Sequence, residues 1–189
     1  MARADLHLVN EADEIEQQFR SVMRRLAGGV SVITAGQGND ITGMTVTSLT
    51  SLSATPPRLL VSINRTAASF ALIERTRLFG VNILGAIQHG IAGRFSNGKL
   101  KGSQRFEGLG WRRGSSGVPL LKNTSATVEC EAEEIIERHS HGIIVGRLLS
   151  LELSPQASGL AYWNGQYIEV DRSDFELLAD VSIPLARVR

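Results

Sequence analysis

Thr42-Gly-Met-Thr-Val-Thr-Ser-Leu-Thr-Ser-Leu-Ser53 is the stretch on which the prediction of the fold depends. Seven of its twelve side chains carry a hydroxyl group, and none is charged. Because β-branched residues favour strands, we predict a strand from Ile41 to Leu52. A row of small hydroxyls beside free backbone N–H groups suits the polar rim of a flat heterocycle and a phosphate. A Thr-rich edge strand without any ligand has the same composition, so the residues alone leave both interpretations open.

Strand patterns continue on both sides of this stretch. Apolar or alternating runs predict strands at 30–34, 59–63, 78–84, 126–133 and 143–153, and Asn164-Gly165 between two apolar runs predicts a tight hairpin. Seven or so strands with only short helices indicate a mainly β fold, a closed or nearly closed antiparallel β-barrel. A strand–helix–strand passage from Leu59 to Leu84 leaves a mixed sheet as the alternative. We favour the barrel because the second half of the chain is almost entirely strand.

The helical signals are fewer. Apolar residues fall at helical spacing at Ile15, Phe19, Val22, Met23 and Leu26, and Gly28-Gly29 follows this stripe. We expect that helix to start near Asn10 or Asp13, and shorter helices at about 67–74 and 87–95. From Ser96 to Pro119 we predict a long irregular excursion of the kind that is often functional. The resulting division is an N-terminal extension (1–13), one domain (14–170) and a C-terminal tail (171–189).

Composition excludes several classes of protein. The 189 residues are 42% hydrophobic and 21% charged, with a formal charge of +1. This balance argues against a nucleic-acid-binding module, and no apolar run is long enough to span a bilayer. Cys130 is the only cysteine, which excludes an intrachain disulfide framework, and we expect a cytoplasmic protein.

Motifs for metal binding and hydrolysis have little support. Only two other histidines accompany His139 and His141, so we predict no metal site. The segment Gly93–Leu100 imitates a P-loop, but it ends in Leu100 where Ser or Thr is required, and it follows a predicted helix. No catalytic acid–base pair stands out, and we assign no catalytic residue.

A longer ordered set of segments resembles a known family. The segments are Phe19-Arg20, Gly29–Thr34, Gly43–Ser53, Pro56-Pro57, Ser62–Asn64, Ser69-Phe70, Phe79–Leu84, Arg94-Phe95, Pro119, Glu129-Cys130, His141–Gly146 and Tyr162–Tyr167. Together they resemble the flavin reductase-like family, which has an FMN-binding split β-barrel. Its members are the small reductase components of two-component flavin-dependent monooxygenases.

The resemblance implies a set of site residues. The cofactor-binding positions would be Met44, Thr45, Val46, Thr47 and Ser48 along the flavin ring, Ser62, Ile63, Asn64 and Ser69 at the ribityl chain and phosphate, Asn82 near the flavin, Arg94 on the phosphate and Phe95 beside it. His141 and Tyr167 would contact the nicotinamide nucleotide. In the family signature a Gly-Asp pair precedes the histidine, whereas this chain has His139-Ser140.

The implied function is NAD(P)H-dependent reduction of a flavin. NADH or NADPH would reduce FMN (or FAD), and a homodimer would supply the reduced flavin to a partner monooxygenase. The alternatives are a non-enzymatic flavin-binding or storage protein, or a flavoprotein reductase of another substrate on the same fold. We expect no nucleic-acid or membrane partner.

Overall fold

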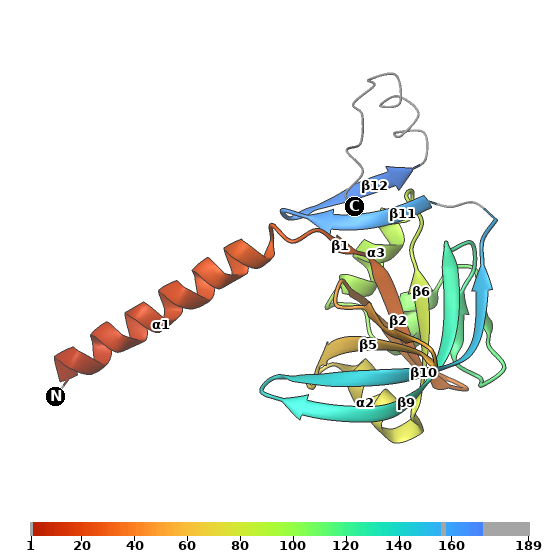
Figure 1. Cartoon of the computed structure of the whole chain (residues 1–189), viewed down its shortest axis with the longest axis horizontal. Coiled ribbons are helices and arrows are strands. Elements are labelled where there is room, and N and C mark those ends of the chain that lie inside the picture. Colours follow the sequence, from red (N-terminus) through yellow and green to blue (C-terminus); the bar gives the residue numbers. More distant parts are fainter. Residues whose placement is uncertain (1, 156–157, 172–189) are drawn as a thin grey trace, which may run out of the picture.

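The computed structural model describes residues 2–155 and 158–171, with side chains described from residue 13 onward. The predicted tail therefore lies outside the described residues, apart from Asp171. The elements follow in the order α1 (Ala2–Met23), β1 (Gly28–Gly29), β2 (Ser31–Gln37), β3 (Asp40–Val46), β4 (Thr50–Ala54), β5 (Pro57–Asn64), α2 (Ala68–Thr76), β6 (Leu78–Ile83), α3 (His89–Ser96), the 3₁₀ helix η1 (Gly102–Phe106), β7 (Trp111–Arg113), β8 (Pro119–Leu121), β9 (Ala126–Arg138), β10 (His141–Leu153), β11 (Ser158–Trp163) and β12 (Gln166–Asp171). The mainly β prediction is confirmed (Figure 1).

One seven-stranded sheet forms the body, in the order β3-β2-β6-β9-β10-β5-β4. Every strand pairing among the described residues is antiparallel, so the mixed-sheet alternative is wrong. β3 and β4 lie at opposite edges of the sheet, yet only the segment 47–49 joins them. Four Cα–Cα steps of 3.8 Å reach at most about 15 Å. The sheet must therefore curl until its two edges approach, which makes it an open barrel.

The same connection corrects one prediction. We expected a single strand from Ile41 to Leu52, but the structure has two, β3 and β4, on opposite edges of the sheet. No Gly or Pro marks the break at 47–49, so the sequence pattern ran straight through it. The hydroxyl-rich stretch is thus the seam of the barrel.

A small three-stranded sheet, β1-β11-β12, closes one end of the barrel. The predicted Asn-Gly hairpin is confirmed between β11 and β12. Asn164 and Gly165 both have positive φ, 50° and 87°, as the two-residue turn requires.

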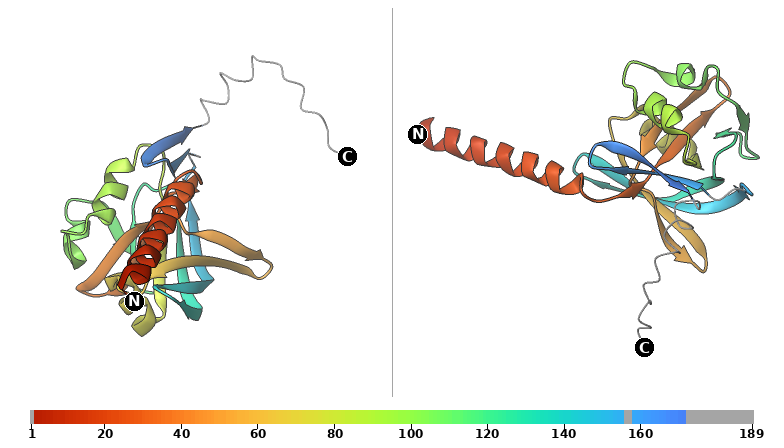
Figure 2. Two further views of the ribbon diagram at one scale, coloured as in Figure 1. Left: turned by 90° about the vertical axis from the view of Figure 1, so that its left-hand side faces the viewer. Right: turned by 90° about the horizontal axis from the view of Figure 1, so that it is seen from above.

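Helix α1 stands apart from the body. It begins at Ala2, earlier than expected, and it projects away from the barrel (Figure 1 and the right view of Figure 2). Just beyond its end, the carbonyl of Arg25 accepts from Trp163 Nε1 at 3.0 Å and that of Arg24 accepts from the backbone N–H of Asn164 at 2.7 Å. The remaining length of the helix is left without support from its own barrel.

The barrel interior is a buried apolar cluster that includes Ile33, Val61, Ile63, Phe79 and Ile144. Each such side chain contributes roughly 1.5–3 kcal/mol by burial. Helix α2 closes one end of this cluster through Phe70, whose ring packs on Gly142 of β10. A Cβ atom at Gly142 would lie 2.2 Å from that ring. This close approach fixes the start of α2 over the ends of β5 and β10.

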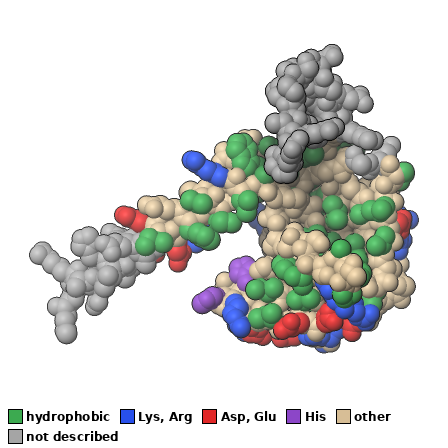
Figure 3. All heavy atoms as spheres, viewed as in Figure 1, with side chains coloured by type: hydrophobic (Ala, Val, Ile, Leu, Met, Phe, Trp, Pro, Cys, Tyr) green, Lys and Arg blue, Asp and Glu red, His purple; other side chains and the backbone are tan. Residues whose placement is uncertain are grey.

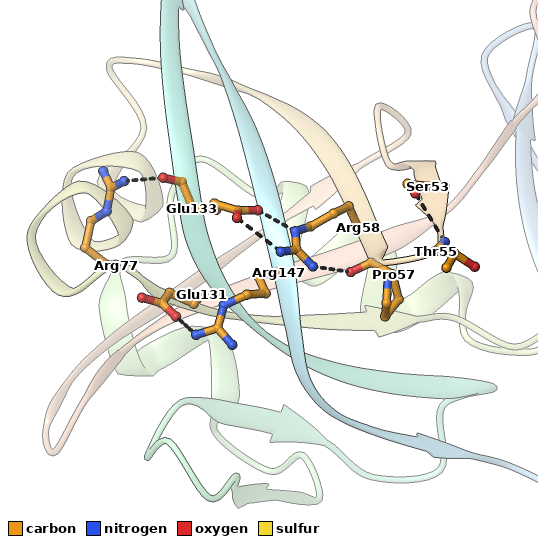
Figure 4. Close-up of polar contacts among 8 residues, drawn as sticks. All are labelled: Ser53, Thr55, Pro57, Arg58, Arg77, Glu131, Glu133 and Arg147. Carbon is orange, nitrogen blue, oxygen red and sulfur yellow. Dashed lines mark hydrogen bonds and ion pairs between the residues drawn. The ribbon is translucent and has the colours of Figure 1, made fainter.

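Ion pairs cross the outer surface of three adjacent strands (Figure 4). Arg58 of β5 pairs with Glu133 of β9, with Nη2 and Oε1 at 3.1 Å, and Arg147 of β10 pairs with Glu131 of β9. The hydrogen bond from Arg58 lowers the pKa of Glu133. Exposed pairs of this kind add little to stability, so we read them as markers of strand register.

Membrane-spanning helices and metal-ligand clusters are both absent from the part of the chain that the structure describes. No helix there is long and apolar enough to cross a membrane. No group of three or more His, Cys, Asp or Glu side chains in the same residues is arranged to hold a metal ion.

Candidate functional site

A pocket of about 370 Å³ opens where β3, the start of α2 and the η1 segment meet. We call it the cationic pocket. Its lining residues are Thr42, Gly43, Met44, Thr45, Thr66, Ala67, Ala68, Ser69, Phe95, Ser96, Lys101, Gly102 and Arg105. No carboxylate is among them. Segments that are distant in sequence thus build one electropositive surface at the rim of the barrel.

Gly43 allows β3 to form one wall of this pocket. A Cβ atom there would lie 2.8 Å from the ring of Phe95 and 2.9 Å from the carbonyl oxygen of Ile33. The glycine therefore lets the ring pack directly on the strand. Two residues further along β3, Thr45 Oγ1 donates a hydrogen bond to the carbonyl of Ala92 at 2.7 Å, which links α3 to β3.

Two buried polar atoms in the pocket have no partner. Ser69 is only 2% exposed, and its Oγ makes no hydrogen bond in the structure. The Nε of Arg105 is likewise buried and unpaired. Most buried polar atoms in proteins are hydrogen-bonded, so two unpaired atoms in residues of one pocket mark it as a candidate ligand site.

The start of α2 adds to this electropositive character. Its N-cap residue, Ala67, has no side chain that could satisfy the first N–H groups of the helix. Unpaired N–H groups at a helix start favour anions. Burial also lowers the pKa of Arg105, and no carboxylate of the described residues pairs with its guanidinium. The pocket fits an anionic group.

A network of arginines holds the η1 segment in place. Arg94 donates from Nε to the carbonyl of Arg105 at 2.8 Å and from Nη2 to that of Gln104 at 2.9 Å. Arg105 donates from Nη1 to the carbonyl of Phe95 at 2.5 Å. The guanidinium of Arg94, which the resemblance assigned to the phosphate, is therefore occupied in positioning Arg105.

Sequence reasoning missed Lys101 and Arg105 as pocket residues. Both lie within the excursion from Ser96 to Pro119, which was flagged as functional only for its length. That was the only available signal, because nothing local in the sequence shows that this loop folds over the start of α2.

The residues predicted to bind a cofactor divide into several groups. Met44, Thr45, Ser69 and Phe95 line the cationic pocket. Val46 and Ile63 are instead buried in the barrel core, and Thr47 is exposed. The structure thus brings four of the predicted residues into one pocket and turns others away from it.

The seam beyond β3 carries a further polar group. Ser48 Oγ donates to the carbonyl of Ser62 at 2.7 Å, which ties the seam to β5. The side-chain oxygen of Asn64 accepts from the N–H and hydroxyl of Thr66 at 2.9 and 2.8 Å. This turn leads the chain directly into the start of α2.

Asn82 does not line the pocket. Its side chain is fully buried and donates to the carbonyl of Val32 at 2.9 Å and to Thr34 Oγ1 at 3.2 Å. It accepts from the backbone N–H of Leu121 at 2.7 Å. With its donors and acceptor engaged, Asn82 links β6 to β2 and β8.

His141 and Tyr167 lie on different sheets. His141 is exposed at the start of β10, opposite Asn64 of β5, and its Nδ1 lies 2.9 Å from Ser140 Oγ. Tyr167 of β12 packs edge-on against Tyr162, with ring centroids 5.4 Å apart. The structure brings His141 next to residues that lead into the cationic pocket, and it groups Tyr167 with the β11–β12 hairpin.

A curled antiparallel barrel with an electropositive pocket at its rim has the architecture of a ligand-binding β-barrel. Within this class, the sequence model described as "Flavin reductase like domain" matches residues 23–171. The chain belongs to this family, and the resemblance noted in the sequence is confirmed.

Individual relatives agree with the assignment. The chain is 35% identical over 170 residues to the "FADH(2)-dependent resorcinol hydroxylase, reductase component" of a Rhizobium species, covering 88% of this chain and 94% of the relative. It is 29% identical over 157 residues to "FMN reductase (NADH) RutF" of Cronobacter sakazakii, covering 83% and 94%. The crystal structure of BorF, the flavin reductase component of a bacterial two-component tryptophan halogenase, superposes with a TM-score of 0.77 at 32% identity, covering 82% of this chain and 98% of BorF. These structural neighbours confirm the split-barrel fold.

Proposed function

We propose that this protein is an NAD(P)H:flavin oxidoreductase that supplies reduced flavin to a partner monooxygenase. Flavin, when bound, supplies a ring that accepts a hydride from the nicotinamide, so the nucleotide is oxidised as the flavin is reduced. The chain's own task is to hold and align two ligands rather than to donate or remove protons. This division of labour agrees with the lack of a recognisable acid–base pair in the sequence.

The observation that carries the proposal is the cationic pocket with its two orphaned donors. Ser69 Oγ, Arg105 Nε and the uncapped start of α2 fit the phosphate of a flavin nucleotide. Met44 and Thr45 border the same pocket, and Ser48 and Ser62 continue the polar edge along the barrel seam. A flavin whose phosphate lies in the pocket would extend its ring along this edge.

The nicotinamide contact is proposed at His141. This side chain is exposed and lies opposite Asn64, beside the proposed ribityl segment. The contact of Tyr167 stays a prediction, because its ring belongs to the other sheet. We expect His141→Ala to raise the KM for NADH several-fold while flavin affinity stays near its starting value.

The direct test mixes the purified protein with NADH or NADPH and FMN or FAD, and follows nicotinamide oxidation by absorbance. Turnover that requires both ligands is expected. No oxidation with any of the four combinations would contradict the proposal.

A flavin storage protein is the second candidate, and the turn before His141 is the observation that favours it. His139, with φ of 50°, and Ser140 form this turn in place of the family's Gly-Asp pair. A protein that binds flavin but leaves it oxidised under excess NADH and NADPH would support storage. Flavin that is reduced yet survives gel filtration would instead favour a reductase of another substrate.

We also propose a homodimer, supported by the exposed apolar stripe of α1 and the segment after it. The side chains of Ile15, Phe19, Val22 and Leu26 are each more than 60% exposed. Figure 3 shows hydrophobic side chains along the described part of the projecting helix. A stripe of this kind on a lone helix needs a partner surface.

Light scattering after gel filtration tests the dimer. The unmodified protein should have the mass of two chains, and Phe19→Glu should shift the population to one chain. The matched control, Gln17→Glu, adds the same charge at another exposed position of α1 and should leave the dimer intact. A monomeric unmodified protein would refute the proposal.

A further inference from the structure

We propose that the cationic pocket selects a terminal, doubly charged phosphate and therefore that this protein binds FMN in preference to FAD. The inference rests on the proposed flavin function. It also addresses a point that the family leaves open, since the relatives include one named for FMN and one named for FADH2.

The first step is that unpaired donors from two elements belong to residues of the same pocket. Ser69 Oγ, 2% exposed as a residue, comes from the first turn of α2, whose initial N–H groups have no side-chain cap. Arg105 Nε comes from η1 on the other side of the pocket. These groups are donors, so together they call for a ligand with several acceptor oxygens.

The second step is that the donors are fixed before any ligand arrives. Arg105 Nη1 donates a hydrogen bond to the carbonyl of Phe95 at 2.5 Å. The guanidinium of Arg94 donates to the backbone carbonyls of Gln104 and Arg105 in the η1 segment. Arg94 thus acts as a positioning residue, and Arg105 is the arginine that lines the pocket. Fixed donors lose little freedom on binding, which strengthens their contribution to affinity.

The third step is the charge of the pocket. Lys101 and Arg105 line it, no Asp, Glu or His does, and neither cation has an ion-pair partner among the described residues. A terminal phosphate brings three acceptor oxygens and a charge of about −1.5 to −2 at pH 7. In FAD the corresponding phosphate is joined to a second phosphate by an anhydride bond, which removes one free oxygen and leaves a single charge on that phosphate. Two unpaired cations and a helix start match the terminal phosphate better.

The test compares the dissociation constants of FMN, FAD and riboflavin, measured by quenching of flavin fluorescence. FMN should bind at least about tenfold more tightly than either other flavin, as expected for an added charge-assisted contact. Between pH 7.5 and 5.5 the affinity for FMN should fall about fourfold, because the second pKa of a phosphate monoester is about 6. FAD and riboflavin have no such group and should change little.

Two variants assign the effect to the pocket. Lys101→Gln and Ser69→Ala should each weaken FMN several-fold, weaken FAD less and leave riboflavin unchanged. Lys99→Gln removes the same charge from an exposed neighbour that does not line the pocket, and it should leave the preference for FMN intact.

The outcomes separate this inference from the proposed function. Equal affinity for FMN and FAD, or a ratio that does not change with pH, overturns the selectivity and leaves flavin reduction standing. Equal weakening of all three flavins by Lys101→Gln also overturns it. Failure of all three flavins to bind overturns both proposals.

Discussion

Two buried polar sites of this protein differ in their hydrogen bonding. Both carboxylate oxygens of Glu129 accept hydrogen bonds, whereas two polar atoms of the cationic-pocket residues have no hydrogen-bond partner. The carboxylate of Glu129, 2% exposed as a residue, accepts from the backbone N–H and hydroxyl groups of Ser115 and Ser116 and from Ser150 Oγ, at 2.6–3.2 Å. In the cationic pocket, Ser69 Oγ and Arg105 Nε are equally hidden and accept or donate nothing.

This difference in hydrogen bonding distinguishes a site that stabilises the fold, at Glu129, from a site suited to ligand binding, in the cationic pocket. Burial opposes the charge of Glu129, but the hydrogen bonds from Ser116, Ser150 and Ser115 outweigh it and lower the pKa to about 2. That charge is therefore part of the folded state and ties the loop after β7 to β9 and β10. The orphaned groups of the cationic pocket instead cost stability in the free protein, and they recover it only when a ligand supplies their partners.

The largest effect is expected when the satisfied site is broken. Glu129→Gln keeps the size of the side chain but presents an NH2 group to donors, so we expect a loss of about 3 kcal/mol in the free energy of unfolding. Urea unfolding at pH 7 measures it. Glu131→Gln, on the exposed ion pair with Arg147, is the control and should change stability by less than about 1 kcal/mol. Equal losses in the two variants would refute the role of burial.

Acid should weaken the same site. Since the folded pKa of Glu129 lies below the ordinary 4.5, its contribution is complete above pH 4.5 and disappears as the pH falls toward 2. By pH 3 the unmodified protein should have lost about 2 kcal/mol from this group alone. The measurement is the difference in unfolding free energy between the unmodified protein and Glu129→Gln, which should shrink with falling pH. A difference that stays constant from pH 7 to 3 would contradict the assignment.

Removal of the unpaired hydroxyl of Ser69 should affect the free energy of unfolding in the opposite direction from removal of the Glu129 carboxylate. Ser69→Ala removes a buried donor that has no partner, so without flavin the variant should be as stable as the unmodified protein or about 1 kcal/mol more stable. Thermal unfolding of flavin-free protein measures this. Ser48→Ala is the matched comparison, because its hydroxyl is bonded to Ser62 and its loss should destabilise by about 1 kcal/mol. A clear destabilisation by Ser69→Ala would show that the hydroxyl has a structural partner.

Much of the fold was accessible from sequence because strand and hairpin signals are local. The strands β5, β6, β9 and β10 and the Asn164-Gly165 turn were predicted from alternation and turn residues, and the structure confirms them. The break between β3 and β4 was missed because it is a consequence of sheet closure. Nothing local at 47–49 distinguishes a strand that continues from one that crosses a barrel seam.

The site divides in the same way. Ser69, Gly43 and Phe95 were singled out because they belong to the family pattern, and all three line the cationic pocket. Arg105 was missed, and Arg94, to which the resemblance assigned the phosphate, donates instead to the backbone of η1 and does not line the pocket. Which of two arginines faces the pocket and which holds the loop depends on tertiary packing between η1 and α3. Asn82 was placed near the flavin by the family resemblance, whereas its side-chain amide is hydrogen-bonded to β2 and β8 inside the barrel.

The smallest effect on stability and FMN affinity is expected at a control pocket, whose volume is almost the same as that of the cationic pocket. A second pocket, of about 360 Å³, includes Arg112, Lys122 and Glu152, and there Arg112 is paired with Glu152. Because both partners are largely exposed, Arg112→Gln should change the free energy of unfolding by less than about 0.5 kcal/mol and leave FMN affinity unchanged. Chemical unfolding and flavin fluorescence measure the two quantities. A loss of FMN affinity in Arg112→Gln would move the anion site to this second pocket, whose volume is nearly the same.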